Sequence, residues 1–139
     1  MAKVIFATHH RMADGMKETL EYIAPGTVDI IALSAYLDNS PVEDQIEEIL
    51  KSVEGESPVV VFTDLLGGSV NQEFTKKLPI YDFHLVAGVN LPVALTIAMQ
   101  LSSGSISRDN ILSAIEEARE QIVYVNDVFL GAGADEDDE

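Results

Sequence analysis

The chain has 139 residues, the size of one domain, and its 24 acidic residues against 8 basic residues give a formal net charge of −16. Such a charge repels the phosphates of nucleic acids and anionic membrane surfaces, so neither is an expected partner. Cysteine is absent, which excludes disulfides and thiolate chemistry, and the apolar run at the N-terminus is too short for a signal sequence or a membrane span. We expect a cytoplasmic protein.

The first half of the chain alternates between β-forming and helix-period segments. Residues 3–7 are almost wholly apolar, which is typical of a central parallel strand. Apolar side chains recur at helical spacing over residues 12–23 and predict an amphipathic helix. A second strand is expected at residues 28–33, and the next helix is expected to use Ser40 as its N-cap and to end near Val53.

The second half of the chain continues this alternation. Residues 58–63 are the most strongly β-forming stretch, and we expect the helix after them to end near Lys77. A fourth strand near residues 83–87 precedes a helix with Pro92 in its first turn, and a last helix is expected over residues 108–121. This pattern predicts a single-domain, doubly wound α/β fold with a mainly parallel sheet of order 2-1-3-4 and helices on both faces.

The C-terminal part of the chain contains two further features. Residues 122–129 are β-prone and poor in turn signals, so we expect an additional strand at a sheet edge. The last five residues are all acidic and follow a glycine-alanine stretch, which is typical of a solvated tail. We therefore predict a domain over residues 1–131 and a disordered acidic tail over residues 132–139.

Residues that can carry chemistry follow two of the predicted strands. Strand one ends at His9, and strand three leads to Asp64 and then to Gly67, Gly68 and Ser69 at a predicted helix start. In a sheet of order 2-1-3-4 these strands are neighbours where the strand order reverses, and ligands bind in the crevice at that point. We therefore expect His9 and Asp64 to face each other.

These residue types in this arrangement favour phosphoryl transfer. Imidazole is a nucleophile at neutral pH, and a carboxylate at one ring nitrogen would fix the tautomer of His9, leave the other nitrogen free to attack and stabilise the cationic ring. Gly67 and Gly68 allow the backbone to approach an anion, and the helix beginning near Ser69 offers N–H groups. We predict that His9 carries a phosphoryl group, with Asp64 as its catalytic partner.

Each of these residues also has a structural interpretation. A histidine at a strand end is often a half-exposed polar residue, and an aspartate after a strand often caps a helix. His10 and His84 are interpreted as structural, and because the ligand spacing of a zinc site is missing we expect neither a metal nor a cofactor. The combination of features at two adjacent strand ends favours the functional interpretation.

Three segments, residues 7–9, 64–69 and 87–92, together resemble the mannose-family IIA components of the bacterial sugar phosphotransferase system. The resemblance runs from the first strand through at least Pro92. It implies that His9 accepts a phosphoryl group from the phosphocarrier HPr and passes it to a IIB protein or domain, with the membrane IIC/IID complex downstream. Because no fused IIB domain follows the predicted strand and tail, we expect a separate IIB protein. It also implies that the aspartate and serine matching Asp64 and Ser69 lie at the histidine and the phosphate.

The resemblance further implies a homodimer in which a C-terminal strand, here residues 122–129, is exchanged between subunits. Two positions depart from the family pattern. His10 stands where a glycine often follows the histidine, so the assignment to His9 rests on the alignment of Ala-Thr-His. Leu65 and Leu66 replace an aromatic residue often found before the glycines, so contacts with the partner protein are expected to differ.

Three alternatives share this architecture. A response-regulator receiver requires an acidic pair at the end of strand one to hold magnesium, where this chain has Thr8, His9 and His10. A flavodoxin-like binding module would hold a flavin phosphate, and a colourless purified protein would exclude it. A phosphocarrier subunit of a dihydroxyacetone kinase has the same fold and histidine, although the segments after strands three and four look more like the sugar-transport branch.

Overall fold

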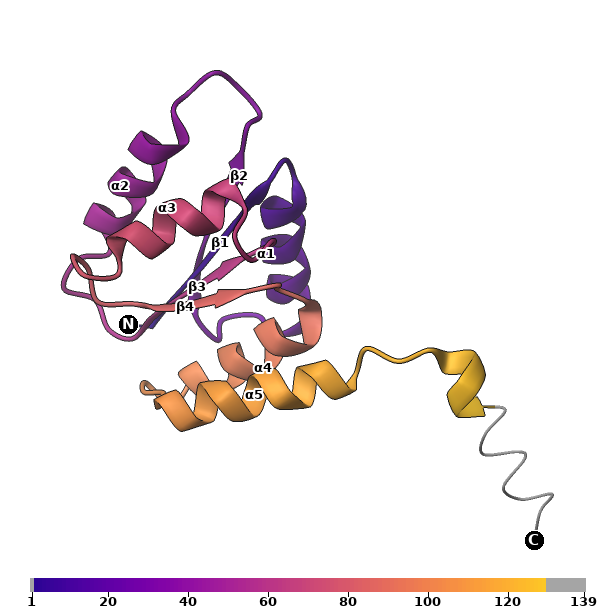
Figure 1. The fold of residues 1–139 in the computed structure, drawn as a ribbon. Coiled ribbons are helices and arrows are strands. Elements are labelled where there is room, and N and C mark those ends of the chain that lie inside the picture. The colour runs from indigo at the N-terminus through magenta and orange to yellow at the C-terminus, as the bar shows by residue number, and fades with distance from the viewer. Residues whose placement is uncertain (1, 130–139) are drawn as a thin grey trace, which may run out of the picture.

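The structure is a computed structural model that describes residues 2–129 of the chain (Figure 1). Its centre is a sheet of four parallel strands in the order β2-β1-β3-β4, which confirms the predicted strand order. The strands are β1 (Lys3–His9), β2 (Asp29–Ala35), β3 (Val59–Thr63) and β4 (His84–Ala87). Since β1 and β3 are neighbours, the sheet reverses its strand order between them.

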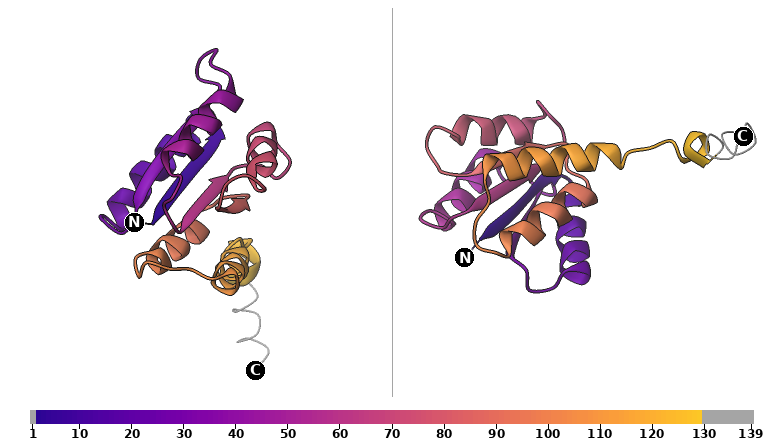
Figure 2. Two further views of the ribbon diagram at one scale, coloured as in Figure 1. Left: turned by 90° about the vertical axis from the view of Figure 1, so that its left-hand side faces the viewer. Right: turned by 90° about the horizontal axis from the view of Figure 1, so that it is seen from below.

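Helices cover both faces of the sheet, as predicted (Figures 1 and 2). They are α1 (Met12–Ile23), α2 (Val42–Ser52), α3 (Ser69–Lys77), α4 (Leu91–Leu101) and α5 (Arg108–Glu120). Helices α1, α4 and α5 form one hydrophobic core with one face of the sheet, and α2 and α3 form a second core with the other face. None of the helices within residues 2–129 is long and apolar enough to cross a membrane.

The two cores explain why β1 is almost wholly apolar. Val4 and Phe6 lie in the core under α1, whereas Ile5 and Ala7 lie in the core under α2 and α3. All four side chains are fully buried. A strand covered on both faces requires apolar residues at every position rather than alternate ones.

Helix starts are fixed by local side chains at α4 and α5 but not at α2. The side chain of Asn90 accepts a hydrogen bond from the Val93 amide at 2.9 Å, and Pro92 lies in the first turn of α4, as predicted. The predicted N-cap at Ser40 is wrong. Helix α2 begins at Val42 without a side-chain cap, because the Ser40 amide donates instead to Asp38 Oδ1 at 2.8 Å.

The edge strand predicted for residues 122–129 is wrong for the isolated chain. Within the described residues the sheet has four strands, and the chain after α5 runs away from it (Figures 1 and 2). Residues 125–129 form a helical turn in which the amides of Asp127 and Val128 donate to the Tyr124 carbonyl at 3.1 and 3.3 Å. Without a strand beside it, the segment satisfies its backbone locally. The predicted domain end at residue 131 and the acidic tail lie outside the described residues.

Candidate active site

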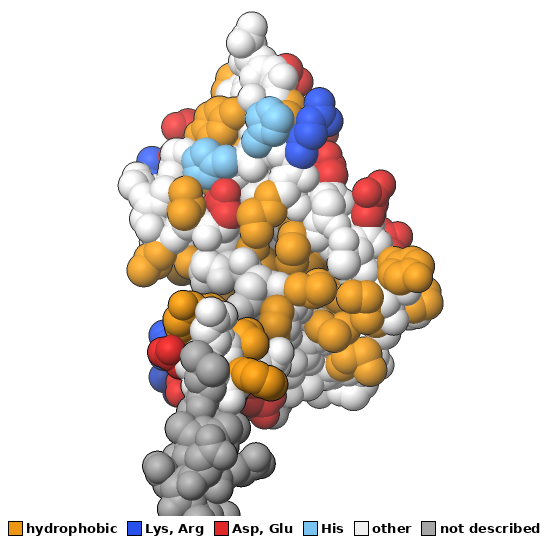
Figure 3. All heavy atoms as spheres, turned by 90° about the vertical axis from the view of Figure 1, so that its right-hand side faces the viewer, with side chains coloured by type: hydrophobic (Ala, Val, Ile, Leu, Met, Phe, Trp, Pro, Cys, Tyr) orange, Lys and Arg blue, Asp and Glu red, His pale blue; other side chains and the backbone are white. Residues whose placement is uncertain are grey.

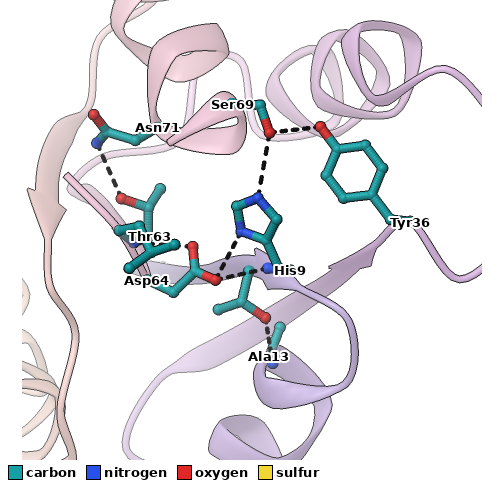
Figure 4. A network of polar contacts seen from close by, with 9 residues as sticks. His9, Ala13, Tyr36, Thr63, Asp64, Ser69 and Asn71 are labelled. Atoms are coloured by element: carbon teal, nitrogen blue, oxygen red, sulfur yellow. Dashed lines mark hydrogen bonds and ion pairs between the residues drawn. The ribbon is translucent and has the colours of Figure 1, made fainter. Parts of the chain in front are cut away.

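The carboxyl ends of β1 and β3 bring His9 and Asp64 together (Figure 4). His9 is the last residue of β1, and its Nδ1 atom lies 2.9 Å from Asp64 Oδ2. The same oxygen accepts the His9 backbone N–H at 2.8 Å, and Asp64 Oδ1 accepts the Leu65 N–H at 3.0 Å. The carboxylate therefore does not cap α3, whose N-cap is Gly68, and its hydrogen bonds instead fix the backbone and the ring of the histidine.

Electrostatics define the tautomer of this histidine. Partial burial of Asp64 raises the pKa of its carboxyl, but the hydrogen bonds from the backbone and ring of His9 outweigh it and hold that pKa below its usual value. An ionised carboxylate can only accept hydrogen bonds, so Nδ1 of His9 carries the proton and Nε2 presents its lone pair. The His9 side chain is 37% exposed and that of Asp64 only 12%, which leaves the imidazole accessible and the carboxylate covered.

Ser69 and Tyr36 lie on the Nε2 side of the ring. Ser69 Oγ is 3.3 Å from His9 Nε2 and 2.6 Å from the hydroxyl of Tyr36. The Tyr36 ring also stacks on the imidazole, with 5.4 Å between the ring centroids and 30° between the planes. Sequence reasoning missed Tyr36. The available signal was its position directly after β2, because β2 pairs with β1 and ends at the same sheet edge.

Two residues at this edge have left-handed backbone conformations. Among the described residues other than glycine, only His10 and Tyr36 have positive φ, at 56° and 67°. For residues with large side chains this region costs on the order of 1–3 kcal/mol, and such strain clusters at functional sites. Both residues directly follow strands that end beside His9, which marks this edge as the strained part of the fold.

The glycine pair shapes the loop beside His9, but its amides are already bonded. Gly67 has φ of 77° and donates its N–H to Asn71 Oδ1 at 3.1 Å, and Gly68 donates to the Leu65 carbonyl at 3.0 Å. A Cβ atom at Gly68 would lie 3.1 Å from Leu65 Cβ and 3.4 Å from His9 Cε1. The role of the glycines visible in this structure is therefore to let the loop pass close to the imidazole.

Helix α3 directs its N-terminus toward the same place. Its first intrahelical bond runs from the Gln72 amide to the Gly68 carbonyl at 2.8 Å, so the amides of Ser69, Val70 and Asn71 precede the helical ladder. Amides at a helix start, together with the helix dipole, favour an anion. Because Ser69 Oγ is beside His9 Nε2, this anion-binding potential lies at that ring nitrogen.

All three buried polar residues of the described chain, Thr8, Thr63 and Asn71, support this edge. Asn71 Nδ2 donates to Thr63 Oγ1 at 3.0 Å, and its Oδ1 accepts the Gly67 amide, which ties the glycine loop to β3. Thr8 Oγ1 accepts the Ala13 amide at 2.7 Å and thereby holds the start of α1. Asn71 and Thr63 were not predicted from the sequence, because buried polar support is a property of packing.

The other histidines do not join this cluster. His84 is the first residue of β4 and pairs in register with Val60, whereas the site lies at the other ends of these strands. His10 turns away from β1 with its positive φ and donates its backbone N–H to the Ala35 carbonyl at 2.8 Å. Within residues 2–129 no group of three or more histidine, aspartate or glutamate side chains is arranged to hold a metal ion.

The sheet order and this histidine-centred edge define a doubly wound α/β protein with a carboxylate-bound imidazole at its switch point. Residues 3–116 match the family model EIIA-man, described as the PTS system fructose IIA component. The chain therefore belongs to the mannose and fructose family of IIA components of the sugar phosphotransferase system, which confirms the family resemblance. It is a phosphotransferase component of that system. No curated protein matches the chain.

Solved structures support the assignment. A Klebsiella pneumoniae protein assigned as a phosphoenolpyruvate-dependent sugar phosphotransferase system permease is 30% identical, with 92% of this chain and 93% of that chain covered and a TM-score of 0.84. The mannose/sorbose-specific IIA subunit of Enterococcus faecalis is 21% identical, with coverage of 88% and 92% and a TM-score of 0.68. A Streptococcus pneumoniae IIA protein associated with a fucose utilization operon is 23% identical, with coverage of 92% and 96% and a TM-score of 0.68. The last two show the shared fold.

Proposed function

We propose that this chain is a phosphoryl carrier that accepts a phosphoryl group from phospho-HPr on Nε2 of His9 and passes it to a histidine of a IIB component during sugar uptake. One observation supports this proposal above the others. Nδ1 of His9 is held by the Asp64 carboxylate at 2.9 Å, while Nε2 lies beside Ser69 at the start of α3. An imidazole held in this way has one protonated nitrogen and one nucleophilic nitrogen.

The proposed transfer leaves every proton in place. The lone pair of His9 Nε2 attacks the phosphorus of phosphohistidine in HPr, the N–P bond of HPr breaks, and its electron pair returns to the HPr imidazole. His9 becomes a phosphorylated imidazolium whose Nδ1 proton remains on the hydrogen bond to Asp64. The carboxylate stabilises the new positive charge on the ring, as a buried aspartate does beside a catalytic histidine. Transfer to the IIB histidine is the same step in reverse.

The phosphoryl group would be received by the start of α3. Bonded to Nε2, the phosphorus would lie on the side of the ring that faces Ser69, and Ser69 Oγ, 3.3 Å from that nitrogen in the free protein, would move back to make room for it. The Ser69 hydroxyl and the amides that precede the first intrahelical bond can donate to its oxygens. Donors that already lie beside the attacking nitrogen stabilise the charge of the transferring group.

The partner proteins would dock on the apolar rim of the site. Leu65 is 58% exposed and Leu66 is 86% exposed, both in the loop after β3, and Leu37 beyond β2 is 42% exposed. Figure 3 shows hydrophobic side chains beside the exposed histidines at this end of the molecule. HPr and IIB must approach the same nitrogen, so we propose that they use this rim in turn, while the IIC/IID complex acts downstream of IIB.

We also propose that the chain forms a homodimer through residues 122–129. This segment exposes large apolar side chains, with Ile122 at 75%, Tyr124 at 64% and Phe129 at 76%. Strand β4 is the last strand of the described sheet on its side, so its outer edge is open to an added strand. A segment exchanged with a second copy would cover both features at once.

The proposed function is tested by labelling the full chain with phosphoenolpyruvate, enzyme I and catalytic HPr. We expect one acid-labile phosphoryl group per chain, stable in alkali as phosphohistidine is, and its loss when unlabelled HPr is added in excess, because the transfer is reversible. A chain that takes up no label, or a label that survives acid, would contradict the proposal.

A further inference from the structure

Tyr36 closes the site on the side opposite Asp64. Figure 4 shows the two residues on either side of the His9 ring. The hydroxyl of Tyr36 lies 2.6 Å from Ser69 Oγ, and its ring stacks on the imidazole at a centroid distance of 5.4 Å. Through these contacts the residue after β2 reaches both the nucleophile on β1 and the hydroxyl at the start of α3.

The protons available on these side chains determine which atom donates in each hydrogen bond. In the neutral imidazole, the form that can attack phosphorus, Asp64 holds the proton on Nδ1, so Nε2 accepts and the Ser69 hydroxyl donates to it. Ser69 has a single hydroxyl proton, so its oxygen is the acceptor in the contact with Tyr36. Tyr36 therefore donates to Ser69, and Ser69 donates to Nε2.

The backbone conformation of Tyr36 indicates that its contacts with Ser69 and His9 hold the residue in place. Its φ of 67° lies in the left-handed region, where a residue with a large side chain is an outlier. Residues persist in such conformations only where the surrounding structure determines them, and they cluster at functional sites. Tyr36 is 49% exposed, so burial of the ring does not explain its position. The contacts with Ser69 and His9 do.

We propose, building on the phosphoryl carrier function above, that Tyr36 is a positioning residue that acts through Ser69 and also covers one face of the phosphohistidine. Once Nε2 is bonded to phosphorus it has no lone pair, and the Ser69 hydroxyl then donates to a phosphoryl oxygen. The Tyr36 hydroxyl continues to donate to Ser69 Oγ and so keeps the serine proton directed at that group. Tyr36 retains its own proton throughout the transfer.

The two parts of the side chain have separable effects. The hydroxyl orients Ser69 and therefore affects the rate of phosphoryl transfer. The stacked ring limits the approach of water to the phosphorus, and hydrolysis requires a water oxygen to bond to phosphorus while the N–P bond breaks. Tyr36→Phe removes the first effect and keeps the second, whereas Tyr36→Ala removes both.

The experiment measures two quantities on the full chain: the rate of phosphoryl transfer from phospho-HPr and the lifetime of the isolated phosphorylated protein. We expect Tyr36→Phe to slow transfer by about threefold to tenfold, the effect of one neutral hydrogen bond. In a Ser69→Ala background the same change should have no further effect, because residues that act through one another are non-additive. Only Tyr36→Ala should shorten the lifetime. Tyr22→Phe, on an α1 side chain that is 87% exposed, is the matched control.

Urea unfolding of each variant verifies that the fold is retained, so a change in rate is not a change in the folded fraction. If wild-type protein accepts no phosphoryl group, the carrier function fails and the inference fails with it. If wild type is labelled but Tyr36→Phe transfers at the wild-type rate, or slows transfer equally with and without Ser69, the role through Ser69 is overturned. Equal lifetimes for the Phe and Ala variants would overturn the shielding role.

Discussion

The carboxyl edge of the sheet and the segment after α5 differ in whether their side chains find partners within the chain. At the edge, His9, Asp64 and Ser69 are bonded to one another, and the buried polar side chains behind them also have partners within the chain. In residues 122–129 the backbone bonds locally and the large apolar side chains face solvent. The comparison teaches that one chain by itself brings His9, Asp64 and Ser69 together, whereas its C-terminal segment leaves large apolar side chains exposed.

The largest expected effect separates the two adjacent histidines at the edge. His9→Ala should abolish labelling by phospho-HPr, because it removes the nucleophile beside Asp64 and Ser69. His10→Ala is the matched control and should retain most of the labelling, since no contact joins its side chain to this cluster among the described residues. The measurement is the stoichiometry of acid-labile phosphate on each purified variant. Labelling that persists in the His9 variant would overturn the site.

The next prediction tests the independence of the two regions. Replacing Tyr124 and Phe129 together by serine should convert a dimer to a monomer, because both are exposed apolar side chains of the segment proposed to be exchanged. Labelling at His9 should change by less than about twofold, since the edge is complete within one chain. Light scattering after gel filtration measures the assembly. Tyr22→Ser is the control on α1, and a monomeric wild-type protein would contradict the proposed exchange.

A third prediction concerns the carboxylate partner. Asp64→Asn should leave the protein folded and slow phosphoryl transfer by about tenfold to a hundredfold, because a hydrogen bond to a charged group contributes about 1.5–3 kcal/mol. Asp82→Asn removes the same charge from an exposed position before β4, at the far end of the sheet, and should transfer normally. Rapid-quench kinetics with phospho-HPr give both rates. Equal rates for the two variants would remove Asp64 from the mechanism.

The smallest effect is on stability and depends on pH. The pKa of Asp64 is lowered in the folded protein, so its ionised form stabilises the fold at pH values above the usual aspartate pKa. That contribution is lost as the pH falls through the lowered value. Asp64→Asn should therefore be less stable than wild type by about 1–2 kcal/mol at pH 7, with a gap that narrows below about pH 4. Urea unfolding at pH 7 and below about pH 4 measures the difference in the free energy of unfolding between the two proteins. A difference that does not change with pH would contradict the predicted contribution of the Asp64 charge.

Much of the edge could be predicted because burial and topology dictate it. A strand buried on both faces must be apolar throughout, which identified β1 as central. The strand order then placed His9 beside Asp64, since parallel neighbours end at the same edge. Both inferences depend on patterns that extend over several residues, and such patterns are visible in a single sequence.

The features that were missed depend on individual contacts. Tyr36 contacts the site from a left-handed backbone conformation, and a tyrosine in the sequence does not predict that conformation. The amides of Gly67 and Gly68 donate to Asn71 Oδ1 and to the Leu65 carbonyl, and the glycine pair in the sequence does not predict these partners. Residues 122–129 have strand-forming composition, but composition alone does not decide pairing, and in the described structure the segment pairs with no strand and residues 125–129 form a helical turn.

The central claim is that Asp64 holds Nδ1 of His9 and leaves Nε2 to carry the phosphoryl group. Nuclear magnetic resonance of the phosphorylated protein with ¹⁵N-labelled histidine distinguishes the two nitrogens, because only one of them becomes coupled to phosphorus. The account predicts coupling at Nε2 of His9 and a protonated Nδ1. Coupling to phosphorus at Nδ1, or at either nitrogen of His10, would contradict it.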